Sequence, residues 1–289
     1  MRTNVKFLLL VISVGFINLS CSDNSVAGDI PDKILNTGTN ENTTDSTSES
    51  TKTTAVGTVI FEDNFDQTDG LPDKTKWVLC PNTGGWGRYM SVSYDQAYVK
   101  DGLLVLKGEK VNGLYKAGGI WSKGLVSFTY GRVEVRARIK SAQGGWPAIW
   151  MIPEPKAKYP TDGEIDLMEQ VSGQTNACQT IHSYYLNNLG HTEQIRQISK
   201  PYKVGDFNTY AVEWTPEKVV FYINGSVTFS YPNLHLADDD TVRQWPFNKP
   251  YFLVLNYALG GANTWPGVID DSQLPGYMEV DWVKVTKIS

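Results

Sequence analysis

Short runs in which apolar and polar residues alternate recur along most of the chain. Strict alternation puts successive side chains on opposite faces of a β-strand, so each run predicts a strand with one buried face. Turn signals separate the runs, and Asn224-Gly225 predicts a tight hairpin. Strands are expected at residues 58–61, 97–99, 103–107, 131–139, 148–151, 180–185, 210–214, 219–223, 226–230, 251–257 and 277–285. Many short strands with glycine-rich turns predict an all-β fold, a jelly-roll sandwich of two curved antiparallel sheets with a concave cleft.

One run departs from the alternation in an informative way. Residues 163–169 read Gly-Glu-Ile-Asp-Leu-Met-Glu. Alternation points Glu164 and Asp166 to one face but sends Glu169 into the core, where an unpaired carboxylate is costly. A β-bulge just before Glu169 would return it to the acidic face. Three close carboxylates shift one another's pKa values and suit acid–base chemistry, although acids also decorate ordinary solvated strands.

An aromatic run upstream favours a cleft over a solvated acidic strand. Residues 144–151 are strongly apolar and include Trp146 and Trp150, and the chain holds nine Trp and fifteen Tyr. Indole faces stack on sugar rings, so carboxylates and indoles in one cleft are typical of carbohydrate enzymes.

Paired carboxylates predict a glycosidase mechanism. Retaining glycosidases use two carboxyls about 5–5.5 Å apart, and Glu164 and Glu169 are the expected pair, with Asp166 between them. Along a straight strand the two glutamates would lie too far apart. The chemistry therefore requires a bent, bulged strand on a concave sheet.

Other reaction classes find less support in the residues. The three histidines, His182, His191 and His235, show no His-x-x-x-His spacing, and no Gly-x-Ser-x-Gly motif occurs. We therefore expect no cofactor to be required for catalysis. His182 either bonds the acid/base carboxylate or the substrate, or is an ordinary packed histidine. A formal net charge of −5 without basic clusters argues against a nucleic-acid partner.

The first 56 residues differ in composition from the rest. Residues 1–20 combine two basic residues with an apolar run, which predicts a secretory signal. Cys21 follows in a lipobox-like context, so we expect it to be lipidated, with an ordinary cleaved signal as the alternative. Residues 21–56 are rich in Ser, Thr and Asn and predict a flexible tether. The catalytic domain, residues 57–289, would then be exported and held by a lipid anchor at the outer membrane or cell surface of a Gram-negative bacterium, as a monomer.

Two cysteines remain within the predicted catalytic domain, Cys80 and Cys178. An exported protein can pair them, but the sequence does not fix the distance between their Cα atoms. Two buried thiols are the alternative. Neither cysteine has a neighbour at ligand spacing, which argues against metal binding through sulfur.

The acidic run resembles the bulged Glu-x-Asp-x-x-Glu signature of glycoside hydrolase family 16, in its laminarinase-like branch. Further similarity extends, in the family's order, through residues 130–137, 146–151, 255–261, 265–267 and 278–285. The resemblance implies a β-jelly roll and an endo-acting, retaining hydrolase. It also implies Glu164 as the nucleophile, Glu169 as the acid/base and Asp166 as the assisting acid. A non-catalytic carbohydrate-binding jelly roll is the rival interpretation.

The candidate substrate-binding residues come from the same motifs: Trp86, Arg88, Trp146, Trp150, His182, Asn256 and Trp265. Many members of the family hold a structural Ca²⁺, whose ligands would fall near Glu62, Gly102 and Asp281. Residues 85–90 depart from the family's Gly-Trp-Gly-Asn-x-Glu pattern, because Arg88 stands at the Asn position. Two substrate classes therefore stay open. We favour a β-1,3/1,4-glucan of the laminarin or mixed-linkage type, and the alternative is a galactose-containing glycan of the mucin, keratan or agar type.

Overall fold

The computed structural model describes residues 57–154, 158–237 and 243–288. The predicted signal (1–20), the lipidated Cys21 and the tether (21–56) lie outside the described residues and stay predictions. Within the described part of the chain, no helix is long and apolar enough to cross a membrane.

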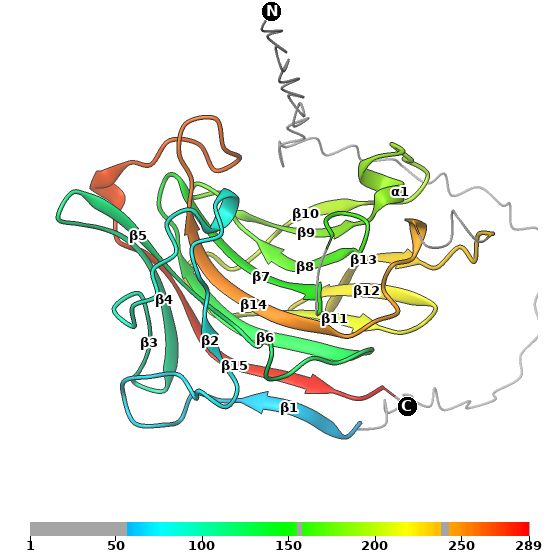
Figure 1. Ribbon diagram of the computed structural model, residues 1–289, viewed down its shortest axis with the longest axis horizontal. Helices are drawn as coiled ribbons and strands as arrows, with labels where there is room; N and C mark the ends of the chain where they lie inside the picture. Colours follow the sequence, from blue (N-terminus) through cyan, green and yellow to red (C-terminus); the bar gives the residue numbers. More distant parts are fainter. Residues whose placement is uncertain (1–56, 155–157, 238–242, 289) are drawn as a thin grey trace, which may run out of the picture.

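Antiparallel strands build two facing layers, as expected from the alternation (Figure 1). We call the first layer the cleft sheet; its strands, in spatial order, are β10 (Gln197–Pro201), β9 (Asn176–His182), β8 (Glu164–Glu169), β7 (Gly145–Pro153), β14 (Tyr251–Leu259) and β5 (Leu114–Trp121), with β2 (Val78–Leu79) on β5.

The second layer, the outer sheet, continues from the cleft sheet through the pairing of β5 with β4. Its strands, in spatial order, are β4 (Leu103–Val111), β15 (Gly276–Thr286), β6 (Gly131–Lys140), β11 (Asn208–Trp214), β12 (Lys218–Ile223) and β13 (Ser226–Pro232), with β3 (Ala97–Lys100) on β4 and β1 (Val59–Asp63) on β15. The described helices are short: η1 (Gly85–Gly87), α1 (Tyr184–Asn187) and η2 (Asp271–Gln273).

Alternation along β6 shows how the sequence forms the sandwich. Val133, Val135 and Ala137 are fully buried between the sheets, whereas the arginines and glutamate between them are half-exposed. β14 differs, because all nine of its residues are buried. It lies between β7 and β5 in the cleft sheet, and its apolar residues join the main core cluster. The central strand of the cleft sheet is therefore held firmly, which fixes its neighbour β7.

The predicted bulge is present in β8. Asp166 pairs with Trp150 of β7, while Met168 pairs with Ile149, so Leu167 is the extra residue opposite that partner strand. The pairing with β9 shifts over the same segment. Leu167 and Met168 are both buried. The register therefore keeps Glu169 on the same face as the acids before it.

The Asn224-Gly225 turn joins β12 to β13 as predicted, and both of its residues adopt positive φ, 51° and 80°. A two-residue hairpin whose central residues both have positive φ matches the twist of the flanking strands. One predicted strand is too long. Residues 180–185 were expected to be extended, but β9 ends at His182. Ser183 caps a short helix there, its Oγ accepting a hydrogen bond from the amide of Leu186 at 3.3 Å.

The thiol of Cys80 is buried and free. Cys80 therefore does not form the disulfide with Cys178 that the sequence left open. Burial raises the pKa of the Cys80 thiol, which keeps it protonated and unreactive.

Candidate active site

The three carboxylates of β8 line one cleft. Glu164, Asp166 and Glu169 all face a cavity of about 510 Å³. The apolar residues between them point into the sandwich and are fully buried: Ile165, Leu167 and Met168. The bulge thus separates six residues into an acidic cleft face and an apolar core face.

Four tryptophans form aromatic walls around these acids. Trp86 meets Trp150 edge to face, with ring centroids 5.0 Å apart. On the other side, Trp146 meets Trp265 in the same way at 5.4 Å. Edge-to-face packing fixes each ring and leaves indole surface available to a flat ligand. All four are residues that the sequence predicted for substrate binding.

Hydrogen bonds from two indoles reach the polar groups of the cleft. Trp146 Nε1 donates to Glu169 Oε1 at 3.0 Å. Trp150 Nε1 donates to Asn256 Oδ1 at 2.7 Å, and Asn256 Nδ2 in turn donates to the Trp146 carbonyl at 3.3 Å. Asn256 is almost fully buried. It therefore couples β14 to β7 and orients the two tryptophans rather than standing free for a ligand.

His182 faces the acids from β9. Its Nε2 lies 3.1 Å from Asp166 Oδ2 and 3.6 Å from Glu164 Oε1. On the opposite side of the ring, Asn187 Nδ2 lies 3.0 Å from Nδ1 and the hydroxyl of Tyr159 lies 3.1 Å away. An amide nitrogen only donates, so Nδ1 accepts and the imidazole proton sits on Nε2, facing the acids. Burial lowers the pKa of His182, which favours this neutral form.

Burial raises the pKa of every acid in the cleft, and repulsion adds to it for the two glutamates. Burial is the largest cause for Glu164, and the negative charge of Asp166 adds to it, so the pKa of Glu164 lies well above its usual range. Burial likewise raises the pKa of Asp166. It raises the pKa of Glu169 to about 8, with the charge of Asp166 adding and the Trp146 hydrogen bond opposing. Three such close acids cannot all ionise near neutral pH, so the cleft retains protons.

The structure places one predicted binding residue outside the cleft lining, so its role stays a prediction, and it adds others to the lining. Arg88 is exposed and does not line the cleft; its Nε donates to the Gly85 carbonyl at 3.4 Å. Four polar residues that sequence reasoning missed do line it: Tyr159, Thr180, Arg196 and Gln197. Thr180 had a signal, since it follows the alternation of its strand and pairs with Asp166. The other three precede or begin regular structure, where periodicity carries no information.

A structural Ca²⁺ was also predicted near Glu62, Gly102 and Asp281, and that site stays a prediction. The carboxylate of Asp281 is paired with Arg136, and Glu62 lies 3.9 Å from the Lys284 ammonium. Within the described residues, one acid–histidine group has ligand atoms within 4.8 Å of one another, namely Glu164, Asp166 and His182. These are the groups of the acid cleft itself.

Comparison with known proteins agrees with this geometry. The model of glycosyl hydrolases family 16 matches residues 87–284. The chain is 36% identical to a β-glucanase from Rhodothermus marinus over 243 residues, 78% of this chain and 84% of that protein. It is 38% identical to a keratan-sulfate endo-1,4-β-galactosidase from Sphingobacterium multivorum over 241 residues, 80% of this chain and 55% of that protein.

A solved structure shares both fold and sequence with the chain. It was reported for endo-acting O-glycanases with which prominent members of the human gut microbiota initiate mucin breakdown. It is 38% identical, with a TM-score of 0.72, covering 80% of this chain and 100% of that one. The matched region contains the bulged acidic strand, the tryptophans of β7 and the central β14. On this agreement of sequence, fold and site, the chain belongs to glycosyl hydrolases family 16.

Proposed function

We propose that this protein is an endo-acting, retaining β-glycosidase that cleaves internal linkages of a polysaccharide or glycan. One observation carries the proposal: a bulge in β8 puts Glu164, Asp166 and Glu169 on the floor of a single tryptophan-walled cleft. An open cleft with aromatic walls suits a chain that extends beyond it in both directions, as endo cleavage requires.

The roles follow from the chemistry of the two glutamates. In the first step, a carboxylate oxygen of Glu164 bonds to the anomeric carbon while the glycosidic C–O bond breaks. Glu169 gives its proton to the leaving oxygen, and a pKa of about 8 keeps that proton available at neutral pH. In the second step, Glu169 takes a proton from water, whose oxygen displaces Glu164 from the sugar. Both displacements invert the anomeric centre, so its configuration is retained overall.

Asp166 and His182 assist without bonding to the sugar. The imidazole Nε2 of His182 lies 3.1 Å from Asp166 Oδ2. The raised pKa of Asp166 lets it hold a proton beside Glu164. While Glu164 is ionised, a proton on Asp166 limits the repulsion between the two carboxyls.

Two substrate classes have specific support. A β-1,3/1,4-glucan is favoured by the β-glucanase relative and by four indole faces, which suit the flat faces of glucose units. A galactose-containing glycan is favoured by the keratan-sulfate relative and the mucin O-glycanase structure, both 38% identical, and by the loss of the family's Asn at Arg88. Tyr159 and Arg196 add polar groups to the cleft, which supports the second class.

We further propose that the catalytic domain, residues 57–289, acts as a monomer outside the cell. The apolar run within residues 1–20, the lipobox-like context of Cys21 and the polar composition of residues 21–56 support export and a lipid-anchored tether at a Gram-negative cell surface. Labelling with a fatty-acid analogue tests this, since Cys21→Ser should abolish the label.

Product analysis tests the enzymatic proposal. Purified protein is incubated with laminarin, mixed-linkage glucan, agarose, desulfated keratan and mucin glycans. We expect short oligosaccharides from one substrate class, with ¹H NMR showing the β-anomer as the first product. Glu169→Gln should abolish most turnover while still binding the same glycan. A first product in the α-configuration would contradict the retaining mechanism, and binding without cleavage by the wild type would favour a carbohydrate-binding module.

A further inference from the structure

Arg196 stands apart from the other arginines of the described residues. Each of the others contacts a carboxylate, a carbonyl or an aromatic ring: Arg132 with Glu134 and Glu213, Arg136 with Asp281, Arg138 with Glu279, Arg88 with the Gly85 carbonyl, and Arg243 with Tyr184. The guanidinium of Arg196 has no hydrogen bond, ion pair or ring contact within the same residues. It lines the acid cleft and is partly buried. Its charge acts on the nearby acids and lowers the pKa of Asp166 and of Glu169, yet its N–H donors have no hydrogen-bond acceptor among the described residues, which leaves them available to a ligand.

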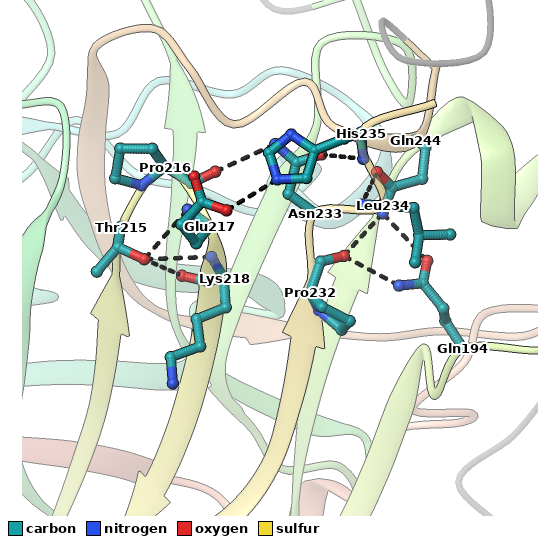
Figure 2. A network of polar contacts seen from close by, with 10 residues as sticks. All are labelled: Gln194, Thr215, Pro216, Glu217, Lys218, Pro232, Asn233, Leu234, His235 and Gln244. Carbon is teal, nitrogen blue, oxygen red and sulfur yellow. Dashed lines mark hydrogen bonds and ion pairs between the residues drawn. The ribbon is translucent and has the colours of Figure 1, made fainter. Parts of the chain in front are cut away.

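The backbone holds Arg196 in place. Its carbonyl accepts a hydrogen bond from the Ile181 amide at 2.9 Å, which fixes it beside β9 directly before β10. Two residues earlier, Gln194 Nε2 donates to the Pro232 carbonyl at 2.9 Å. The fully buried Gln244 donates to that same carbonyl and to Gln194 Oε1 (Figure 2). The arginine is therefore presented by an anchored segment, so little backbone entropy is lost when it binds a ligand.

The charge of Arg196 is unique in the cleft. Among the described lining residues it is the one Lys or Arg side chain, and burial keeps His182 neutral. The acids beside it repel any anionic ligand, so an anion enters this cleft only where a local cation offsets them. A guanidinium offers a fixed fork of donors that matches a sulfate or carboxylate bidentately.

We propose that Arg196 forms a subsite for an oxyanion carried by the glycan, either a sulfate ester or a sugar carboxylate. The subsite rests on the proposed glycosidase function and selects among its substrates. Gln197 and Thr180, which pair across β10 and β9 and also line the cleft, supply neutral polar groups beside the guanidinium. A neutral β-glucan leaves this charge unused, so the inference favours an anionic, galactose-containing glycan.

A matched set of glycans tests the subsite with the full chain. kcat/KM is measured on 6-O-sulfated poly-N-acetyllactosamine, on the same polymer after desulfation and on a sialylated form. Arg196→Gln should lower kcat/KM about 10- to 100-fold more on the anionic polymer that is recognised than on the neutral one. Arg196→Lys keeps the charge but loses the forked pair of donors. Its kcat/KM on the anionic polymer should lie between those of wild type and Arg196→Gln.

Lys200→Gln is the control, because it removes the same charge from an exposed residue of β10, the strand that follows Arg196, and Lys200 does not line the cleft. Loss on the sulfated polymer alone assigns a sulfate, and loss on the sialylated polymer alone assigns a carboxylate. Equal loss on charged and neutral polymers would mean that Arg196 acts only through the charges of the acids. That result, or no loss at all, overturns the subsite.

The wild type gives a test that does not depend on a folded variant. Raising the salt concentration from about 50 to 300 mM should lower its kcat/KM on the recognised anionic polymer more than on the neutral polymer. Cleavage of the neutral polymer with rejection of both anionic ones also overturns the subsite and leaves the glycosidase proposal intact. Failure to cleave any glycan would instead contradict the glycosidase proposal.

Discussion

Two faces of the same sandwich differ in how their charged residues are arranged: one pairs opposite charges, and the other clusters like charges. On the outward face of the outer sheet, each acid of β6, β11 and β15 contacts an arginine of β6, as Glu279 contacts Arg138 at 2.6 Å. On the cleft face of β8, three carboxylates crowd together opposite a neutral imidazole and the guanidinium of Arg196, which makes no ion pair or hydrogen bond within the described residues.

Exposure does not explain this difference. The side chains of Glu164 and Glu279 are 19% and 18% exposed, respectively. What differs is the neighbour: Glu279 has a cation within hydrogen-bonding distance, whereas Glu164 has other acids. Paired charges stabilise a fold modestly and are common. Like charges held together raise their pKa values and cost stability, so they indicate chemistry.

Replacing one glutamate on each face by glutamine is the strongest test of the difference between the two faces. Glu164→Gln removes the attacking oxygen, and we expect kcat/KM to fall by at least about 10³-fold on the best substrate. Glu279→Gln makes the same chemical change at equal exposure. It touches no cleft residue, so we expect its activity to stay within about twofold of wild type. Equal losses in the two variants would contradict the assignment of Glu164.

Thermal unfolding of the same two variants provides an independent readout. A carboxyl whose folded pKa is raised above its unfolded value contributes full stability at low pH and loses it as pH rises toward the folded pKa. Glu164→Gln removes that penalty, so its Tm should equal or exceed that of wild type at pH 7, with no gain at pH 4. Glu279→Gln should show no gain at either pH.

The outward face and the acidic strand could both be predicted from the sequence, because alternation alone specifies which residues share a face. Residues 131–139 predicted β6, and the misplaced Glu169 predicted the bulge. β5 was missed, since Gly118 and Gly119 interrupt its pattern. β10 was missed because it lies at the sheet edge and is mostly exposed.

Only those cleft residues that lie on strands could be predicted from the sequence. Trp146 and Trp150 lie on β7, next to the acidic strand, so periodicity and motif placed them correctly. Tyr159 and Arg196 reach the cleft from segments outside regular strands, and their positions depend on distant contacts. Gln194, for example, is anchored by the Pro232 carbonyl and by Gln244, at separations that no local pattern encodes. The same limit applies to Arg88, whose position outside the cleft lining no local pattern encodes.

The pH dependence of activity sharpens the account of the acidic face. Glu169 must be protonated to donate, and its pKa is about 8, so kcat/KM should fall about tenfold per pH unit above that value. Glu164 must be ionised to attack, and its raised pKa puts the acidic limb above the usual glutamate range of about 4.3. A profile measured from pH 4 to 10 checks both limbs.

A tryptophan variant assigns the basic limb to Glu169. The Trp146 hydrogen bond lowers the pKa of Glu169, so Trp146→Phe should move the basic limb to higher pH while the acidic limb changes less. His235→Asn is the control, since His235 does not line the cleft and makes the exposed contact with Glu217 that Figure 2 shows. A basic limb that stays in place in Trp146→Phe would mean that another group donates the proton.

The smallest expected effect concerns the paired face. Arg132 donates to Glu134 and Glu213 at 2.8 Å each and lies 4.7 Å from the ring centroid of Tyr222. Arg132→Gln leaves both acids without their shared cation on neighbouring strands, and we expect the free energy of unfolding to fall by about 1–2 kcal/mol. Tm should then fall by about 2–4 °C per kcal/mol, with kcat/KM unchanged.

The exposed pair of His235 and Glu217 calibrates that result. Their side chains are 62% and 68% exposed and only 2.8 Å apart, so solvent screens the pair, and Glu217→Gln should change Tm by less than about 1 °C. If Arg132→Gln also leaves Tm unchanged, the close ion pairs of Arg132 on the outward face do not stabilise the fold. If it lowers kcat/KM, the two faces are coupled, and charge pairing no longer separates structure from chemistry in this sandwich.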